Sequence, residues 1–201
     1  GPLVDFLANV AREKSAWILA GSIIEKAGTK IYNTSLLINR AGKIVATYRK
    51  MHLFEAFLEK GLHIRESDAY EAGNRPVTAN LEGWKAGLSI CYDLRFPELF
   101  RRYSALGCNL LFIPSNFSLR TGRDHWQVLV RARAIENQCF VVAPNQCGTN
   151  EAIGVDTYGH SMIVGPWGEV LAEARDREGV IEARLDPNLL KKSRARIPAL
   201  R

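Results

Sequence analysis

Short apolar runs and helical patterns alternate through the middle of this chain, whereas hairpin-like pairs of apolar runs lie toward both ends. Apolar residues spaced three and four apart predict helices at residues 3–13, 97–106 and 124–137. Apolar runs between turn residues predict strands at residues 16–24, 31–39, 43–48, 77–81, 84–90, 109–113, 139–143, 160–164, 170–174 and 179–185. This order predicts an α/β sandwich in which helices cover mixed, largely buried sheets, rather than a purely parallel doubly wound sheet.

Two segments stand out within this pattern. The helix at residues 124–137 has a wide apolar face, made of Trp126, Leu129, Val130, Ala134 and Ile135. Residues 51–74 are polar and irregular, which is long for a loop in a compact domain, and long ordered loops often carry function.

Composition restricts the class of protein. At 201 residues, 47% hydrophobic and 24% charged, the chain suits one globular domain spanning residues 1–201. No apolar run is long enough to span a membrane, and no secretory signal is visible at the N-terminus. The four cysteines show no metal-type pairing and no disulfide framework, so we expect no metal site and a cytoplasmic, reducing location. No nucleotide-binding glycine loop is present, and we expect no cofactor.

The formal net charge is +6. The basic residues are scattered, apart from Arg101–Arg102, Arg131 with Arg133, and a tail at residues 191–201. No aromatic side chains are interleaved with them, and no nucleic-acid motif accompanies them. We therefore interpret the basic side chains as solvated surface and expect neither a nucleic acid nor a membrane as partner.

Cys91 lies between a short apolar strand and the helix that Pro97 begins. Proline suits the first turn of a helix, where its missing N–H costs little. A thiol at such a corner can lie beside free backbone N–H groups, which a nucleophile needs to stabilise the oxyanion of an attacked carbonyl. A buried core cysteine explains the same position equally well.

A cysteine nucleophile needs a base and a positive charge nearby. The candidate bases are the four histidines, His52, His63, His125 and His160, together with several glutamates. His125 opens a predicted helix, where a histidine more often has a structural role. Lys50 follows a predicted strand and precedes the long irregular segment, so it could point into a cleft, although a solvated lysine is the ordinary alternative.

Several motifs in order resemble the nitrilase superfamily of carbon–nitrogen hydrolases over essentially the whole chain. These are Arg49-Lys50-Met51-His52-Leu53-Phe54, Cys91-Tyr92-Asp93-Leu94-Arg95-Phe96-Pro97-Glu98, Thr121-Gly122-Arg123-Asp124-His125-Trp126, Arg131-Ala132-Arg133-Ala134-Ile135-Glu136-Asn137, Tyr158-Gly159-His160-Ser161 and Pro166-Trp167-Gly168-Glu169. Within that superfamily the chain most resembles the Nit-type amidase branch, which comprises ω-amidase-like and deaminated-glutathione-amidase-like enzymes. The resemblance implies a four-layer α-β-β-α sandwich of mixed sheets.

The resemblance also implies a thiol mechanism for cleaving an amide in a small linear, carboxylate-bearing substrate. Cys91 would form a thioester acyl-enzyme, while Lys50 and the backbone N–H of Tyr92 hold the oxyanion. Glu66 matches a second family glutamate and would hold Lys50 or orient the substrate. Asn116, Phe117 and His125 are the other residues expected at the substrate site. The resemblance further implies a homodimer or a higher homo-oligomer.

The sequence departs from the family pattern upstream of Lys50. The family's general-base glutamate lies on an N-terminal strand–helix–strand portion, and only 49 residues precede Lys50 here. Asp5 and Glu13 fall on the predicted first helix and Glu25 follows the next predicted strand, so none of them matches that glutamate. We therefore expect an N-terminally truncated carbon–nitrogen hydrolase domain that lacks this portion.

Two other interpretations compete with an active amidase. The first is a non-catalytic fragment or relic of such a hydrolase that acts only as an assembly or binding module. The second is a papain-like cysteine hydrolase, which needs a Cys–His pair with an orienting asparagine. The nitrilase-type motifs around His125 and His160 argue against that second interpretation.

Overall fold

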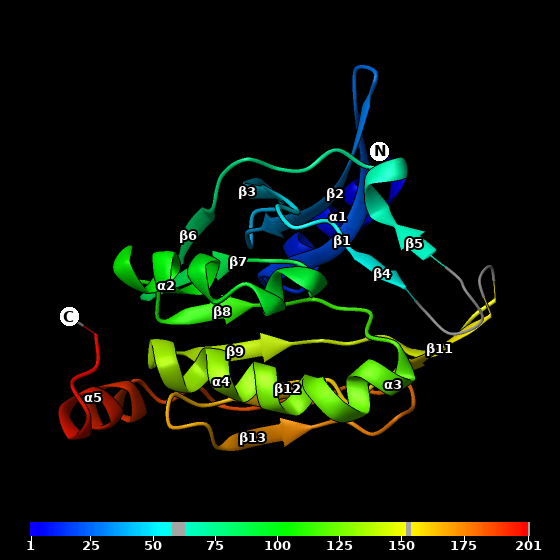
Figure 1. The fold of residues 1–201 in the computed structure, drawn as a ribbon. Helices are drawn as coiled ribbons and strands as arrows, with labels where there is room; N and C mark the ends of the chain where they lie inside the picture. The colour runs from blue at the N-terminus through cyan, green and yellow to red at the C-terminus, as the bar shows by residue number, and fades with distance from the viewer. Residues whose placement is uncertain (58–62, 152–153, 201) are drawn as a thin grey trace.

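The computed structural model describes residues 1–57, 63–151 and 154–200, so part of the long segment at residues 51–74 lies outside the described residues. The chain forms four layers (Figure 1), in the order helices α2 and α4, a six-stranded sheet, a three-stranded sheet and helix α1. The helices are α1 (Pro2–Glu13), α2 (Pro97–Ala105), α3 (Leu119–Thr121), α4 (Gln127–Asn137) and α5 (Pro187–Arg196). The predicted α-β-β-α sandwich of mixed sheets is confirmed.

The three-stranded sheet is an antiparallel meander near the N-terminus. Its strands, in spatial order, are β1 (Ile18–Ala27), β2 (Lys30–Ile38) and β3 (Ile44–Arg49). Helix α1 contacts β1 and β2, and its only fully buried residue is Ala11. Lys50 directly follows β3, so this sheet places the lysine at the end of an edge strand.

The six-stranded sheet mixes parallel and antiparallel pairs. Its strands, in spatial order, are β13 (Val170–Glu173), β12 (Met162–Val164), β9 (Phe140–Ala143), β8 (Leu110–Phe112), β7 (Trp84–Leu88) and β6 (Val77–Leu81). β7, β8 and β9 run parallel, with α2 and α4 as their crossovers, and the other pairs are antiparallel. The carboxyl ends of the three parallel strands therefore meet at one edge of the sheet, where Cys91 follows β7.

Two apolar clusters fill the spaces between the layers. One lies between the helices and the six-stranded sheet and includes Phe100, Tyr103, Trp126 and Val130. The other lies between the two sheets and includes Leu37, Tyr48, Leu88, Ile90 and Phe140. Cys91 packs against both clusters, because the chain passes from one to the other at this corner.

Several short elements were not anticipated. The long segment after Lys50 contains the hairpin strands β4 (Glu55–Phe57) and β5 (His63–Arg65), followed by a 3₁₀ turn at Glu66–Asp68. A second small hairpin is formed by β10 (Cys147–Asn150) and β11 (Val155–Tyr158). Helix α5 also went unpredicted, although Asp186 caps it by accepting from the Asn188 N–H at 2.9 Å and Pro187 begins it.

The predicted strand at residues 179–185 is wrong. This segment pairs with no strand among the described residues, and Val180 is 95% exposed. Only Leu185 packs against the cluster between the sheets. Alternating apolar residues here reflect contact on one side of an extended segment, whereas a strand also needs a backbone partner.

The predicted helix at residues 124–137 is regular only from Gln127. Residues Gly122–Trp126 form a π-helical turn instead. Two tertiary contacts accompany the wider turn: the Trp126 indole donates to the His160 carbonyl at 2.7 Å, and Gly122 lies so close to Tyr158 that a Cβ would meet its Cβ at 2.2 Å. Ile135, expected on the apolar inner face, is 49% exposed because α4 turns that position outward.

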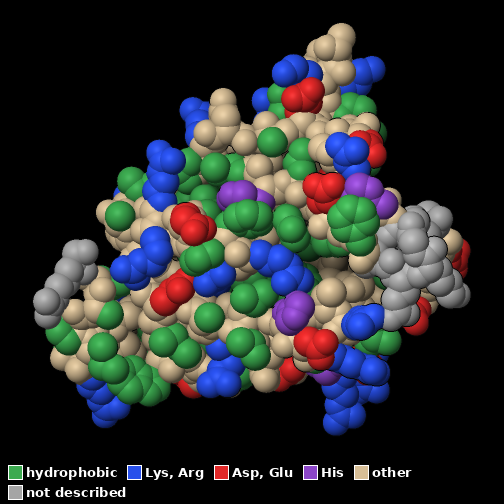
Figure 2. Space-filling model, in the orientation of Figure 1, with side chains coloured by type: hydrophobic (Ala, Val, Ile, Leu, Met, Phe, Trp, Pro, Cys, Tyr) green, Lys and Arg blue, Asp and Glu red, His purple; other side chains and the backbone are tan. Residues whose placement is uncertain are grey.

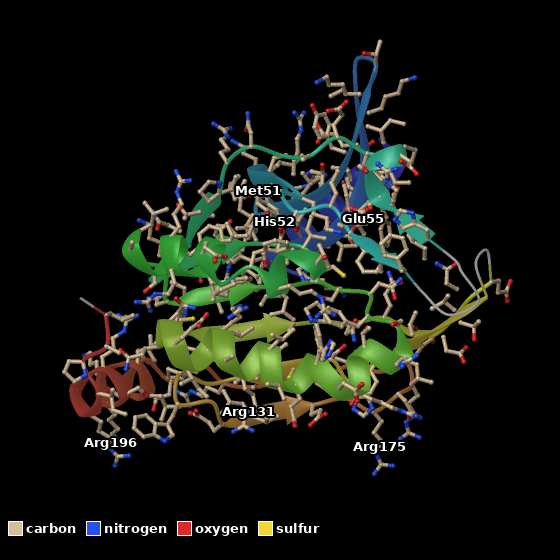
Figure 3. The ribbon with its side chains drawn as sticks, viewed as in Figure 1. Met51, His52, Glu55, Arg131, Arg175 and Arg196 are labelled. Carbon is tan, nitrogen blue, oxygen red and sulfur yellow. The ribbon has the colours of Figure 1, made fainter. Side chains whose placement is uncertain are left out.

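No helix among the described residues is long and apolar enough to cross a membrane. Figure 2 shows acidic and basic side chains intermingled over the face of Figure 1. Arg131, Arg175 and Arg196 lie well apart along the lower edge of Figure 3. Arg133, however, is only 5% exposed, so its expected place on the solvated surface is wrong. Its guanidinium donates to the Leu94 carbonyl at 3.0 Å and pairs with Glu136 at 2.8 Å.

Candidate active site

Cys91 begins a 3₁₀ turn, Cys91–Arg95, that joins β7 to α2. Its φ angle is +48°, in the left-handed region that non-glycine residues rarely adopt. The Cys91 N–H donates to the Pro114 carbonyl at 2.9 Å, and the Asp93 N–H donates to the Ile90 carbonyl at 3.1 Å. The N–H of Tyr92, the residue between Cys91 and Asp93, makes neither of these two hydrogen bonds. The positive φ of Cys91 persists only where the surrounding contacts hold it. This conformation turns the thiol away from the strand direction.

The Cys91 thiol is half-buried beside the segment that follows β8. The Asn116 N–H approaches the sulfur at 3.5 Å, and the Asn116 carbonyl lies 3.7 Å from it. Burial raises the pKa of the thiol, while the Lys50 ammonium and the Asn116 backbone hydrogen bond lower it. Glu66 and Asp93 also act on the thiol, and their negative charges raise its pKa.

Lys50 is 3% exposed and forms an ion pair with Glu66. Its backbone is held from both sides: its N–H donates to Asn33 and its carbonyl accepts from Gly73, both at 2.8 Å. Glu66 in turn accepts from the Asn33 amide at 2.9 Å and from the Phe54 N–H at 2.7 Å. A buried lysine is stable only where a carboxylate compensates its charge, so the solvated alternative for Lys50 does not apply.

The other predicted site residues surround this pair unevenly. Tyr92 packs edge-on against Phe54, with ring centroids 5.2 Å apart. Phe117 is buried, and the Arg95 guanidinium lies over its ring at 5.2 Å from the centroid. His125 is exposed, and its Nδ1 lies 3.1 Å from an Arg95 nitrogen. The structure thus joins His125 to the site through Arg95 rather than through Cys91.

The candidate bases are engaged elsewhere. Among the described residues no histidine bonds to Cys91: His52 faces Asp93, His63 faces Glu55, and His160 faces Glu173. Glu25 accepts from Thr34 and Arg49. The papain-like interpretation needs a Cys–His pair, and the described part of the chain contains none.

Three residues near Lys50 and Cys91 were missed as parts of the site. They are Asp93, Tyr48 and His52, of which the sequence suggests only His52, as a candidate base. Asp93 is fully buried and interacts with both Tyr48 and His52. Asp93 and His52 belong to the motifs that flank Cys91 and Lys50, so the motifs themselves were the available signal. Their mutual contact could not be inferred, because 41 positions separate them along the chain.

The arrangement brings together a half-buried thiol, a buried ammonium and backbone N–H groups at one edge of the sheet. A thiol in this setting can attack a carbonyl carbon, and the ammonium can stabilise negative charge on the carbonyl oxygen. This chemistry is that of acyl transfer and of hydrolysis.

Comparison with known proteins agrees with this chemistry. The sequence profile of the family described as carbon-nitrogen hydrolase matches residues 1–195. Deaminated glutathione amidase of Synechocystis sp. is 43% identical over an alignment of 201 residues, which covers 97% of this chain and 73% of that protein. Omega-amidase NIT2 of Homo sapiens is 38% identical over 201 residues, which span 100% of this chain and 72% of that protein.

Solved structures give the same result. Nit3 of Saccharomyces cerevisiae, a member of branch 10 of the nitrilase superfamily, superposes with a TM-score of 0.90 at 35% identity, covering 100% of this chain and 71% of that one. An amidase variant from Nesterenkonia sp. AN1 superposes with a TM-score of 0.80 at 26% identity, covering 98% and 74%. In that protein acrylamide has added to the active-site cysteine.

Proposed function

The chain belongs to the carbon-nitrogen hydrolase family, and from this premise we propose that it hydrolyses the amide bond of a small linear, carboxylate-bearing amide through a thioester on Cys91. The observation that carries the proposal is the Cys91 thiol at a left-handed corner, under the influence of the buried Lys50 ammonium. The cysteine adduct in the Nesterenkonia amidase supports the choice of nucleophile.

In the proposed reaction, the Cys91 sulfur attacks the amide carbonyl carbon and forms a tetrahedral oxyanion. The Lys50 ammonium and the Tyr92 N–H stabilise that charge. The proton of the thiol passes to a base and then to the leaving nitrogen, and the C–N bond breaks to release ammonia or an amine. Water hydrolyses the thioester, releases the carboxylic acid and restores the thiol. Glu66 compensates the charge of the buried Lys50 ammonium during these steps.

Arg95 is the group best placed to bind a carboxylate of the substrate. It lies on the same turn as Cys91, and its guanidinium approaches the rings of Tyr92 and Phe117 at 5.9 and 5.2 Å. His125 orients this guanidinium by accepting from it at 3.1 Å. An arginine fork matches the geometry of a carboxylate. The exposed Asn116, beside the sulfur, then contacts the part of the substrate near the reacting carbonyl.

The test is intact-mass analysis of the protein incubated with linear amides. We expect a mass increase equal to one acyl group, lost in Cys91→Ala and retained in Cys147→Ser, which alters the other half-exposed thiol. An adduct that survives Cys91→Ala would refute the proposed nucleophile. The Arg95→Gln variant should bind a monoamide of a dicarboxylic acid more weakly than the parent does. Its affinity for the amide of the matching monocarboxylic acid should be unchanged.

The alternative function, a non-catalytic assembly or binding module, gives a different result in the same experiment. Such a protein would bind amides without forming an acyl adduct or releasing ammonia. The free state of all four cysteines suits the reducing, cytoplasmic location that we propose for either function.

A further inference from the structure

The carboxylate of Asp93 is fully buried, and both of its oxygens accept hydrogen bonds. Oδ1 accepts from the His52 N–H at 3.0 Å and lies 2.7 Å from His52 Nδ1. Oδ2 accepts from the Tyr48 hydroxyl at 2.7 Å and from the Ile90 N–H at 2.8 Å. A buried carboxylate is costly unless its oxygens find donors, and here four donor groups surround it.

These donors come from two distant parts of the sequence. Tyr48 and His52 stand two residues before and two residues after Lys50. Ile90 directly precedes Cys91, and Asp93 itself stands on the turn that Cys91 begins. A single carboxylate therefore joins the segment that carries the ammonium to the corner that carries the thiol. Figure 3 shows the labelled His52 between the strands of the three-stranded sheet and the ribbon that contains this corner.

The donors from the Lys50 side are held in place. Burial raises the pKa of Tyr48 far above its ordinary value, so its hydroxyl keeps its proton and remains a donor to Asp93. The Tyr48 oxygen also accepts from the Met51 N–H at 3.3 Å. The His52 ring stacks on Phe96, with centroids 3.8 Å apart and planes within 10°. Because an ionised carboxylate only accepts, the proton between it and His52 resides on Nδ1.

The corner itself needs such support. Cys91 adopts a φ of +48°, and this conformation persists only where the surrounding contacts determine it. The bond from the Ile90 N–H to Asp93 fixes the backbone immediately before Cys91, and the bond from the Cys91 N–H to Pro114 fixes the residue itself. The carboxylate thus supports the corner and the lysine segment at once.

We propose that Asp93 is a positioning residue for the amide hydrolysis, whose carboxylate bridges the Lys50 segment to the Cys91 corner and so sets the placement of the ammonium relative to the thiol. The proposal rests on the proposed function for its effect on turnover, and on the geometry alone for its effect on the thiol. Asp93 is fully buried, so we assign it no contact with the substrate. It acts through Tyr48 and His52 on one side and through Ile90 on the other.

The bridge is best tested by removing one of its donors without changing any charge. Tyr48→Phe removes the hydroxyl that donates to Asp93 and keeps the ring. Tyr103→Phe is the matched control, because Tyr103 is also fully buried and donates its hydroxyl to the Leu88 carbonyl, outside the bridge. His52→Leu is a second bridge variant, which removes the Nδ1–H donor but keeps the backbone N–H, and it serves if Tyr48→Phe does not fold.

The first readout is the rate at which iodoacetamide alkylates Cys91 as a function of pH, measured in a Cys147→Ser background. Among the described residues, the charged groups that act on this thiol are Lys50, Glu66 and Asp93, and Tyr48→Phe leaves all three in the protein. We expect Tyr48→Phe to raise the pKa of Cys91, because the ammonium is no longer held in place, and to slow alkylation at pH 7 about fivefold, the worth of one hydrogen bond. Tyr103→Phe should leave the rate within about twofold of the parent.

A double variant then separates positioning from general destabilisation. In a Lys50→Met background, Tyr48→Phe should no longer change the alkylation rate, because its effect passes through the ammonium. Equal slowing by Tyr48→Phe and Tyr103→Phe, or the same slowing by Tyr48→Phe with and without Lys50→Met, would overturn the proposal.

Turnover supplies the second readout. Tyr48→Phe should lower kcat about fivefold with KM nearly unchanged, since the misplaced ammonium matters most when the oxyanion forms. If the parent protein hydrolyses no amide, the proposed function fails, but the alkylation cycle still decides the role of Asp93.

Discussion

Lys50 carries its charge inside the protein, in contact with the Glu66 carboxylate. The two side chains are 3% and 12% exposed, so water screens their interaction weakly. Such a pair adds little net stability compared with apolar residues of the same shape, but removing one partner leaves a buried charge without compensation. We therefore interpret the pair as a functional feature, and breaking it should lower stability.

Lys50→Met should abolish amide turnover and destabilise the fold by about 3 kcal/mol, because Glu66 then loses its cation. It should also raise the pKa of Cys91 further, since the ammonium lowers it. Chemical denaturation and the pH profile of alkylation measure the two effects. Adding Glu66→Gln should restore part of the stability but no activity. A Lys50→Met protein with full turnover would contradict the role of the ammonium.

The residues of the candidate site could be predicted where they belong to a recognisable sequence motif. Cys91 could be placed at a strand–helix corner because Pro97 and the preceding apolar run are local signals. Lys50 and Glu66 came from the family resemblance. The buried state of Arg133 was not predictable, because its guanidinium bonds to the Leu94 carbonyl, 39 positions away.

At the scale of elements, the three-stranded sheet is tied together by a ladder of polar side chains. Glu25 on β1 accepts from the Thr34 hydroxyl on β2 at 2.7 Å and from Arg49 on β3 at 2.6 and 2.9 Å. The Arg49 guanidinium also lies 3.9 Å from the centroid of the Tyr32 ring. The hydrogen bonds from Arg49 lower the pKa of Glu25, against the opposing effect of burial.

This ladder predicts a pH dependence of stability. A carboxyl group whose pKa is lower in the folded state stabilises the protein above its unfolded pKa, near 4.3, and that contribution is lost as the pH falls through the folded pKa. Thermal unfolding between about pH 6 and pH 3 should therefore show a smaller loss of stability in Glu25→Gln than in the parent. Glu13→Gln, on the exposed side of α1, is the control. Identical pH profiles for the parent and Glu25→Gln would refute this assignment.

The predicted helices and strands are correct where one face of the element packs against other elements. The strands of both sheets, α1 and α2 follow their apolar periodicity closely. The turn at Gly122–Trp126 and the segment at residues 179–185 differ, because one depends on contacts with Tyr158 and His160 and the other on the lack of a strand partner among the described residues. Periodicity reports which side chains are buried, and it carries no information on which backbone groups are paired.

At the scale of the whole molecule, helix α4 exposes apolar side chains on the outer layer. Val128 and Ile135 on α4 are 67% and 49% exposed, and Trp167 is 47% exposed. A Cβ added at Gly168 would lie 2.6 Å from the Ile135 side chain, so the turn that contains Trp167 and Gly168 adjoins α4 at Ile135. We propose this α4 surface as the contact of the expected homodimer or higher homo-oligomer.

Light scattering after size exclusion tests that proposal. The parent should have at least twice the 22.5 kDa mass of one chain, and the double variant Val128→Lys, Ile135→Lys should return to 22.5 kDa. Val180→Lys, at a position that is 95% exposed on another segment, should leave the mass unchanged. A parent that elutes at 22.5 kDa would contradict the proposed oligomer.

The class of fold follows from the sequence alone, and the sequence also points to the groups that we propose to react. Apolar periodicity is a local property, and the motifs around Lys50 and Cys91 are contiguous, so both can be recognised without coordinates. How the lysine segment and the cysteine corner are joined becomes visible only in the folded molecule. Asp93, Tyr48 and His52 meet across 41 and 45 positions of chain, and a buried carboxylate is stable there only because the folded layers bring its donors to it.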